Sequence, residues 1–246
     1  MIYVTGDTHS DHDSFKLTEE DFPLQKGMTK DDYLIICGDF GCVWGGRSDG
    51  FWLDWYEERP FTTLWIDGNH ENFDLLNSGK YPVEMWNGGK VHKIRDHVFH
   101  LMRGQVFEID GKSFFTMGGA TSIDRLYRNE GTSWWPQEEL QPGEAEEAMK
   151  NLAAWDYKVD YVITHTVPAG FKRDTLCRMM RLTPCESAME DFLNLVQQGV
   201  EYKYWFNGHF HVDRDFSVDR QYCLFNRIVA LDGLLTIVND GTEIVY

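Results

Sequence analysis

Three features are scarce in this sequence, and each scarcity narrows the class of protein. No run approaches the roughly 18 consecutive apolar residues that a membrane-spanning helix needs, and no signal segment opens the chain. We therefore expect a cytoplasmic protein with no membrane partner. The five cysteines are scattered along the chain, which favours reduced thiols over a disulfide framework or a cysteine-rich zinc site.

Basic residues are also few. The chain has 23 Lys and Arg against 40 Asp and Glu, for a net charge of −17. A surface with this balance repels polyanions at long range, so extended nucleic acid is a disfavoured partner. A small phosphorylated substrate stays compatible, because bound divalent cations dominate the field of their own site.

What is present indicates one packed domain over residues 1–246. The chain has 246 residues, 42% of them hydrophobic and 15% aromatic, which is enough for a sizeable core. We find no internal repeat, low-complexity tract or Pro/Ser-rich linker that would divide it. The aromatic residues leave an oligomer interface, and hence a homo-oligomer, open.

Five short apolar runs each lead into a small polar motif. A strand followed by a polar turn places side chains at the carboxyl edge of a sheet, where open α/β folds build their sites. We therefore interpret the five motifs as parts of one polymetal centre. The runs are residues 2–4, 33–36, 63–66, 161–163 and 204–206, and their motifs are Gly6-Asp7-Thr8-His9, Gly38-Asp39, Asp67-Gly68-Asn69-His70-Glu71, Thr164-His165 and Asn207-Gly208-His209-Phe210-His211.

The segments between these runs mix two kinds of element. Apolar spacing predicts helices over 49–58, 143–155 and 187–198. Asp110-Gly111 between two alternating runs predicts a hairpin, and further short strands are expected near the C-terminus, over 222–225, 228–231 and 234–238. Two packed sheets with helices outside account for this mixture better than one doubly wound sheet. We therefore predict an α/β fold with a two-sheet sandwich flanked by helices.

Each motif alone is weak, but their combination points to metal chemistry. In extended backbone, residues two apart face the same side, so Asp7 and His9, or His209 and His211, can grip one ion. Asn69 suits a hard, oxygen-seeking ion. The remaining histidines, His12, His92, His97 and His100, follow no strand in this way and are interpreted as surface or hairpin residues, with a supporting role for His12 left open.

With these motifs in order, the chain resembles the calcineurin-like metallophosphoesterases. Their signature runs Asp-x-His, Gly-Asp, Gly-Asn-His-Glu/Asp, a lone His, and Gly-His-x-His, and every element is present between residues 5 and 211. The resemblance implies their two-sheet α/β sandwich. It also implies two bound divalent or trivalent metal ions, with manganese favoured and iron or zinc compatible.

The family's roles, carried onto the matching positions, define two metal sites that share one carboxylate. Asp39 would bridge both metals. A hydroxide between the metals would attack phosphorus, and His70 would stabilise the phosphoryl oxygens and protonate the leaving group. Asn69 would also face the substrate. One metal would be held by Asp7, His9, Asp39 and His211, and the other by Asp39, Asn69, His165 and His209.

The resemblance is thinner for substrate recognition. The protein Ser/Thr phosphatases extend the second motif to Gly-Asp-x-Val-Asp-Arg-Gly, whereas Asp39 is followed by Phe-Gly-Cys-Val-Trp. Their phosphate-binding arginine is therefore missing at that place. A glycine-flanked polar segment, 118–135, supplies Arg125 and Arg128 as candidate anion-binding residues of a lid or specificity loop. A basic cluster that starts at Lys172 is interpreted as an exposed helix face.

These observations favour a hydrolase of small or nucleotide-derived phosphoesters, acting on monoesters or diesters. A Ser/Thr protein phosphatase of the same family is the alternative within the class. A scaffold of this fold that has lost catalysis is the alternative from another class. Such a scaffold would be expected to lose ligands or the acid–base histidine, and here every expected position is filled.

Overall fold

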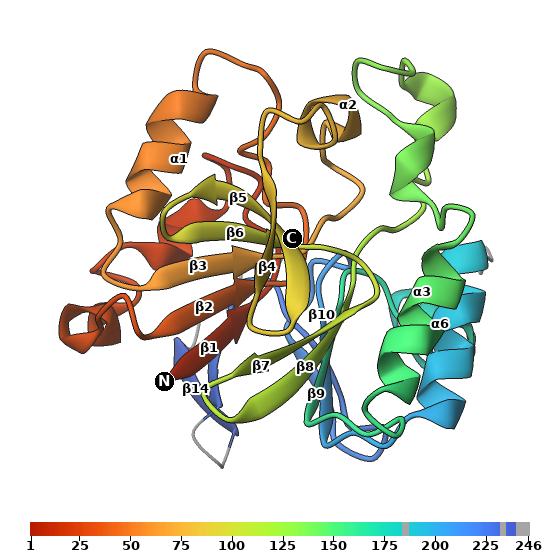
Figure 1. The fold of residues 1–246 in the computed structure, drawn as a ribbon. Helices are drawn as coiled ribbons and strands as arrows, with labels where there is room; N and C mark the ends of the chain where they lie inside the picture. Colours follow the sequence, from red (N-terminus) through yellow and green to blue (C-terminus); the bar gives the residue numbers. More distant parts are fainter. Residues whose placement is uncertain (184–186, 232–234, 240–246) are drawn as a thin grey trace.

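The computed structural model describes residues 1–183, 187–231 and 235–239. Within these ranges the chain forms two mixed sheets with helices on their outer sides (Figure 1). The predicted two-sheet α/β fold is therefore confirmed.

The larger sheet has eight strands in the order β14-β13-β1-β2-β3-β6-β5-β4. Its central strands β1, β2, β3 and β6 run parallel, and antiparallel strands extend it on both sides. The carboxyl ends of β1, β2 and β3 therefore meet at one edge of the sheet, and the first three motifs follow directly after them. The strand bounds are β1 Ile2–Thr5, β2 Tyr33–Ile36, β3 Thr62–Trp65, β4 Val83–Trp86, β5 Gly89–Arg95, β6 Val98–Leu101, β13 Ile228–Leu231 and β14 Leu235–Asn239.

The second sheet has six strands in the order β11-β12-β10-β9-β8-β7. Strands β8, β9, β10 and β12 are parallel neighbours, so the motifs after β9 and β10 also lie at a common edge. The predicted hairpin is confirmed: Asp110 and Gly111 have φ of 51° and 69°, as a two-residue type I′ turn requires. The bounds are β7 Gln105–Ile109, β8 Lys112–Met117, β9 Tyr161–Thr164, β10 Tyr204–Asn207, β11 Arg214–Phe216 and β12 Gln221–Cys223.

The helices cover the outer faces of the two sheets. Helix α1 lies against the larger sheet, and α3 and α6 lie side by side against the smaller one (Figure 1). The three predicted helices are confirmed. Helix α6 begins where predicted because the Ser187 hydroxyl accepts a hydrogen bond from the Glu190 amide, a standard N-cap. The α-helix bounds are α1 Asp49–Glu57, α2 Phe73–Leu76, α3 Glu144–Ala153, α4 Ala169–Phe171, α5 Cys177–Met180 and α6 Ala188–Gly199, with a π-helical turn over Lys172–Leu176.

The core between the sheets is apolar and draws on both of them. Buried side chains from β1, β2 and β3 pack against buried aromatic and aliphatic side chains from β7, β8, β9 and β10. Because this layer fixes the two sheets against each other, it also fixes the distance between the motifs at their carboxyl ends. The predicted C-terminal strands are present as β12, β13 and β14; Leu234 lies outside the described residues.

Candidate metal centre

The structure brings all seven predicted metal ligands together at the edge where the two sheets meet. The three motifs of the larger sheet supply Asp7, His9, Asp39 and Asn69, and the two motifs of the smaller sheet supply the others, His165, His209 and His211. Asp7, Asp39 and His165 are almost fully buried, whereas the His211 side chain is half exposed. The site is thus buried around Asp7, Asp39 and His165 and open toward His211.

One group of ligand atoms gathers around Asp7 and His9. His211 Nε2 lies 3.1 Å from Asp7 Oδ2, and His9 Nε2 lies 3.3 Å from Asp39 Oδ2. Asp7, His9 and His211 present one ligand atom each within 4.8 Å of one another. These are the residues that the resemblance assigned to one metal.

A second group gathers around His165. Its Nε2 lies 3.1 Å from Asn69 Oδ1 and 3.3 Å from Asp39 Oδ2. The ring of His209 packs against it, with centroids 4.9 Å apart. Asp39 Oδ2 therefore contacts both groups, as expected for a carboxylate shared by two ions.

The donor set fits metal binding in spacing and in type. Bonds of about 2.0–2.2 Å from one ion to two ligands place those ligand atoms roughly 3–4 Å apart, and the contacts above fall in that interval. Imidazole nitrogens combined with carboxylate and amide oxygens suit manganese, iron and zinc. His165 is also oriented for the purpose: its Nδ1 lies 2.8 Å from the carbonyl oxygen of Cys37, so Nδ1 donates there and Nε2 is the nitrogen that would bind a cation in place of a proton.

The charges at the centre reinforce one another. Burial disfavours the ionised Asp39, but His165 and His9 outweigh it and hold the pKa of Asp39 well below its usual range. Burial likewise opposes protonation of His165, yet Asp39 and Asp7 raise its pKa to about 9. His165 and His211 likewise lower the pKa of Asp7 against the effect of burial. Asp39 and Asp7 are therefore anionic at neutral pH, the form in which they bind cations.

The backbone at the centre adopts conformations that non-glycine residues rarely take. Asp39, His209 and His211 have φ of 46°, 67° and 50°. Such left-handed residues are costly and cluster at functional sites. Gly68 has a steric role here, since a Cβ at this position would lie 2.0 Å from Asp39 Oδ1. Only glycine lets the chain leading to Asn69 pass so close to the shared carboxylate.

His70 lies beside the shared carboxylate. Its amide donates to Asp39 Oδ1 over 2.7 Å, and by distance it can join His9 and Asp39 as a ligand group. Burial lowers the pKa of His70, and Arg128 adds to this effect while Asp39 opposes it. The role of His70 as proton donor to a leaving group stays a prediction.

The two predicted anion-binding arginines differ in position. Arg128 reaches the centre: its two terminal nitrogens each lie 3.2 Å from a ring nitrogen of His70, and its Nε pairs with Asp124 at 2.7 Å. Arg125 is exposed on the same loop and lines an open pocket with Ser122 and Ser187. Its role in substrate binding stays a prediction.

Several residues of the site were not predicted. Asp13 Oδ2 lies 2.6 Å from His9 Nδ1 and thereby orients that imidazole. Asp13 follows His9 by four positions, so the signal was present in the sequence. Phe225 stacks on the ring of His211, with centroids 4.5 Å apart. Ser122 Oγ accepts a hydrogen bond from Asn69 Nδ2. These two contacts join distant parts of the chain and leave no local signal.

Two interpretations from the sequence are confirmed only in part. His92 and His100 are not surface residues, since both are buried with their Nδ1 atoms 2.9 Å apart. The hairpin alternative is confirmed, because the two residues face each other across the antiparallel strands β5 and β6. In the basic cluster, Arg173, Arg178 and Arg181 are exposed as predicted. Lys172 is not: it is buried and forms an ion pair of 2.7 Å with Glu190 of α6.

The fold and the paired clusters define a class of protein, the α/β proteins with a candidate metal centre at the carboxyl ends of two facing sheets. The profile of the calcineurin-like phosphoesterase family matches residues 1–213. The chain therefore belongs to this family, and membership supports metal-dependent phosphoester hydrolysis. None of the described helices is long and apolar enough to cross a bilayer.

Comparisons with individual proteins add little to this. No curated protein matches the chain. Among solved structures, it is similar to an Aquifex aeolicus protein of unknown function, AQ665. The match has 18% sequence identity, a TM-score of 0.33, and covers 76% of this chain and 89% of that one. A TM-score of this size carries no argument about fold or function.

Proposed function

We propose that this protein is a dinuclear metal-dependent phosphoester hydrolase that acts on small or nucleotide-derived phosphoesters. The observation that carries the proposal is the position of Asp39, whose Oδ2 lies 3.3 Å from both His9 Nε2 and His165 Nε2. One buried carboxylate thus connects two groups of ligands, which is the arrangement that two neighbouring cations need.

The residues would divide the metal binding between them. Two cations, when bound, supply an activated water near neutral pH and neutralise charge on a phosphoryl group. Manganese is the favoured ion, and the mixed N/O ligands are compatible with iron or zinc. One position would be held by Asp7, His9, Asp39 and His211, and the other by Asp39, Asn69, His165 and His209.

His70 and Arg128 would handle the substrate. The imidazole of His70 lies beside Asp39 at the partly exposed side of the centre, where it can give a proton to a departing alkoxide. Arg128 places a cation against His70, where it can bind phosphoryl oxygens. This arginine comes from the loop after β8, and so replaces in function the arginine that the second motif lacks.

Small substrates are favoured by charge. The net charge of −17 repels long polyanions. A compact phosphoester can reach His70 and Arg128 together. Arg128 and the bound cations can then neutralise its negative charge.

The test is turnover by the manganese-reconstituted protein on paired substrates, p-nitrophenyl phosphate and bis-p-nitrophenyl phosphate. The proposal predicts hydrolysis of at least one, with the preference identifying monoester or diester chemistry. Chelator should abolish turnover and added Mn²⁺ should restore it. Two bound metal ions with no turnover on either substrate, or on a panel of nucleotide phosphoesters, would contradict the proposal and favour a non-catalytic scaffold.

A further inference from the structure

The side-chain amide of Asn69 has different neighbours on its two sides. Asn69 Oδ1 lies 3.1 Å from His165 Nε2, whereas Nδ2 donates to Ser122 Oγ over 3.1 Å. Asn69 and Ser122 are almost fully buried, so water does not compete for these contacts. The direction of the amide matters because its oxygen can bind a cation and its NH₂ group cannot.

Glu138 determines which way Ser122 points. The Ser122 amide donates to Glu138 Oε1 over 2.8 Å, and its hydroxyl donates to Oε2 over 2.7 Å. In its ionised form the carboxylate can only accept hydrogen bonds. The one hydroxyl proton of Ser122 is therefore committed to Glu138, and its lone pairs are left for Asn69. Asn69 therefore contacts Ser122 through the donor Nδ2, which turns Oδ1 toward His165.

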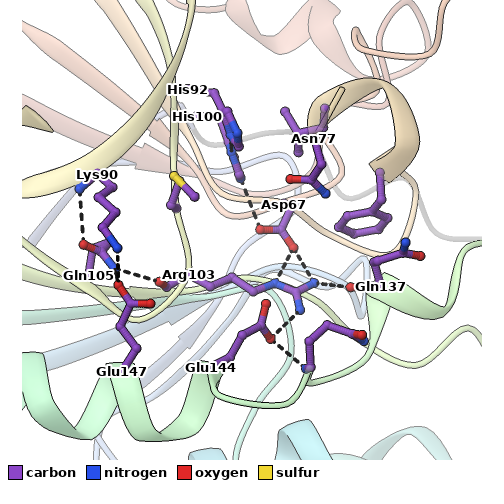
Figure 2. A pocket seen from close by; sticks show the side chains of 14 residues that line it. Asp67, Asn77, Lys90, His92, His100, Arg103, Gln105, Gln137, Glu144 and Glu147 are labelled. Carbon is purple, nitrogen blue, oxygen red and sulfur yellow. Dashed lines mark hydrogen bonds and ion pairs between the residues drawn. The ribbon is translucent and has the colours of Figure 1, made fainter. Parts of the chain in front are cut away.

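Arg103 fixes the turn that carries Glu138 to the end of strand β3. Its terminal nitrogens donate to the carbonyls of Gln137 and Glu139 over 2.8 and 2.9 Å. Its Nε and Nη2 also donate to Asp67 Oδ2, over 2.8 and 2.6 Å (Figure 2). Asp67 precedes Asn69 by two residues. The contacts therefore form a closed ring that runs from Asn69 through Ser122, Glu138, Arg103 and Asp67 back to Asn69.

The segment that carries Ser122 passes close to Arg103 and to the turn at Glu138. A Cβ at Gly119 would lie 2.5 Å from Arg103 Nη2 and 2.5 Å from the carbonyl oxygen of Glu138. The glycine lets the segment run between the guanidinium and the turn without displacing either. The glycine-flanked stretch noted in the sequence thus brings Ser122 to Asn69, besides leading to Arg128.

We propose that Ser122 and Glu138 are positioning residues that orient the Asn69 amide, so that Oδ1 faces the metal position shared with His165. Arg103 holds the turn that carries Glu138. The inference rests on the proposed function, because it assigns the pair to one of the two metal positions. Groups that orient metal ligands typically contribute 10–100-fold in metal affinity. Loss of either residue should therefore lower the metal affinity of one position and leave the affinity of the other unchanged.

The test is Mn²⁺ titration of the metal-free, full-length protein, followed by calorimetry and by electron paramagnetic resonance. We expect the wild-type protein to bind two ions and give the spectrum of a coupled pair. In Ser122→Ala and in Glu138→Gln, one ion should bind with near wild-type affinity and the other about 10–100-fold more weakly. At one equivalent of Mn²⁺, both variants should show the spectrum of an isolated ion.

Thr121→Val is the matched control. The Thr121 hydroxyl is buried and makes no hydrogen bond with the described part of the chain, so the substitution removes a neighbouring hydroxyl without touching the Asn69 contacts. Its Mn²⁺ titration should match the wild type. Melting curves of the metal-free variants check folding, and Ser122→Ala, which deletes one oxygen atom, carries the test if Glu138→Gln does not fold.

Two results would overturn the inference while leaving the proposed function intact. One is wild-type affinity for both ions in Ser122→Ala. The other is equal weakening in Thr121→Val, which would assign the effect to local packing. A wild-type protein that binds no pair of ions would overturn the proposed function and the inference together, so the two failures are distinguishable.

Discussion

Replacing Arg103 with leucine removes the cation from a buried ion pair. The side chains of Arg103 and Asp67 are 7% and 2% exposed, and their closest atoms are 2.6 Å apart. Arg103 also pairs with Glu144 at 3.0 Å (Figure 2). In the variant, leucine fills much of the space, but Asp67 stays buried, and His100 is its remaining ion-pair partner among the described residues.

The expected loss of stability is large. Breaking a buried pair by removing one partner costs about 3–5 kcal/mol, because the remaining charge is left uncompensated. For a chain of this size, each kcal/mol shifts the melting temperature by about 2–4 °C, so Arg103→Leu should melt roughly 6–20 °C lower. Arg95→Leu is the matched control. Arg95 pairs with Asp54 at 3.1 Å, but the two side chains are 31% and 67% exposed, so the loss should be about 0–1 kcal/mol.

The assay is thermal and urea unfolding of the metal-free proteins, repeated across pH. Burial opposes the charge of Asp67, but Arg103 and His100 outweigh it and hold its pKa below the usual value. The stabilisation is therefore present above the unfolded pKa of about 3.9 and is lost as pH falls below it. The gap between wild type and Arg103→Leu should shrink there. A loss no larger than that of Arg95→Leu at pH 7 would refute this reasoning.

Three further predictions concern the site and its surroundings. His70→Ala should keep both metal ions and lose about 10²–10⁴-fold in kcat, measured with metal analysis on the same sample; unchanged kcat would remove His70 from the chemistry. Arg128→Ala should raise KM without loss of metal. Arg125→Ala removes the same charge from the same loop, so comparing the KM values of the two variants separates the effect of charge from the effect of Arg128's position beside His70. Equal kinetics in wild type and Arg128→Ala would reject its contact with substrate. Burial and His100 lower the pKa of His92 to about 4, so the unfolded chain takes up a proton that the fold excludes as pH falls from about 6.5. His92→Gln should flatten the loss of stability between pH 6.5 and 4, and an unchanged slope in urea titrations would contradict this.

The parts of the fold that local pattern determines were predictable. Strands β1, β2, β3, β9 and β10 are buried apolar runs that end in turn-forming residues, and this signal needs no partner to be visible. Strands β4 and β5 were missed because β4 is exposed and alternates weakly. The turn between them contains Asn87-Gly88, with φ of 46° and 93°. That dipeptide is a strong hairpin signal, and it was available in the sequence.

The candidate site divides in the same way. Its predicted ligands follow strand ends, so the order of motifs places them together once the sheet is assumed. The residues that hold those ligands do not follow strand ends. Ser122 contacts Asn69 from 53 positions away in the sequence, and Glu138 in turn contacts Ser122. The buried His100 contacts Asp67, which lies 33 positions earlier. Such contacts are set by the packing of the two sheets, which local periodicity does not contain.

The most direct test of the central claim is the metal content of Asp39→Ala. The buried carboxylate of Asp39 lies between two groups of ligands, so removing it should deplete both manganese ions after reconstitution and dialysis. Asp96→Ala is the control, since that carboxylate is 78% exposed and pairs with Lys93; it should keep two ions. Elemental analysis of the folded variants gives the answer. Loss of both ions in Asp39→Ala alone is the predicted result, and two fully occupied sites in that variant would contradict the shared centre.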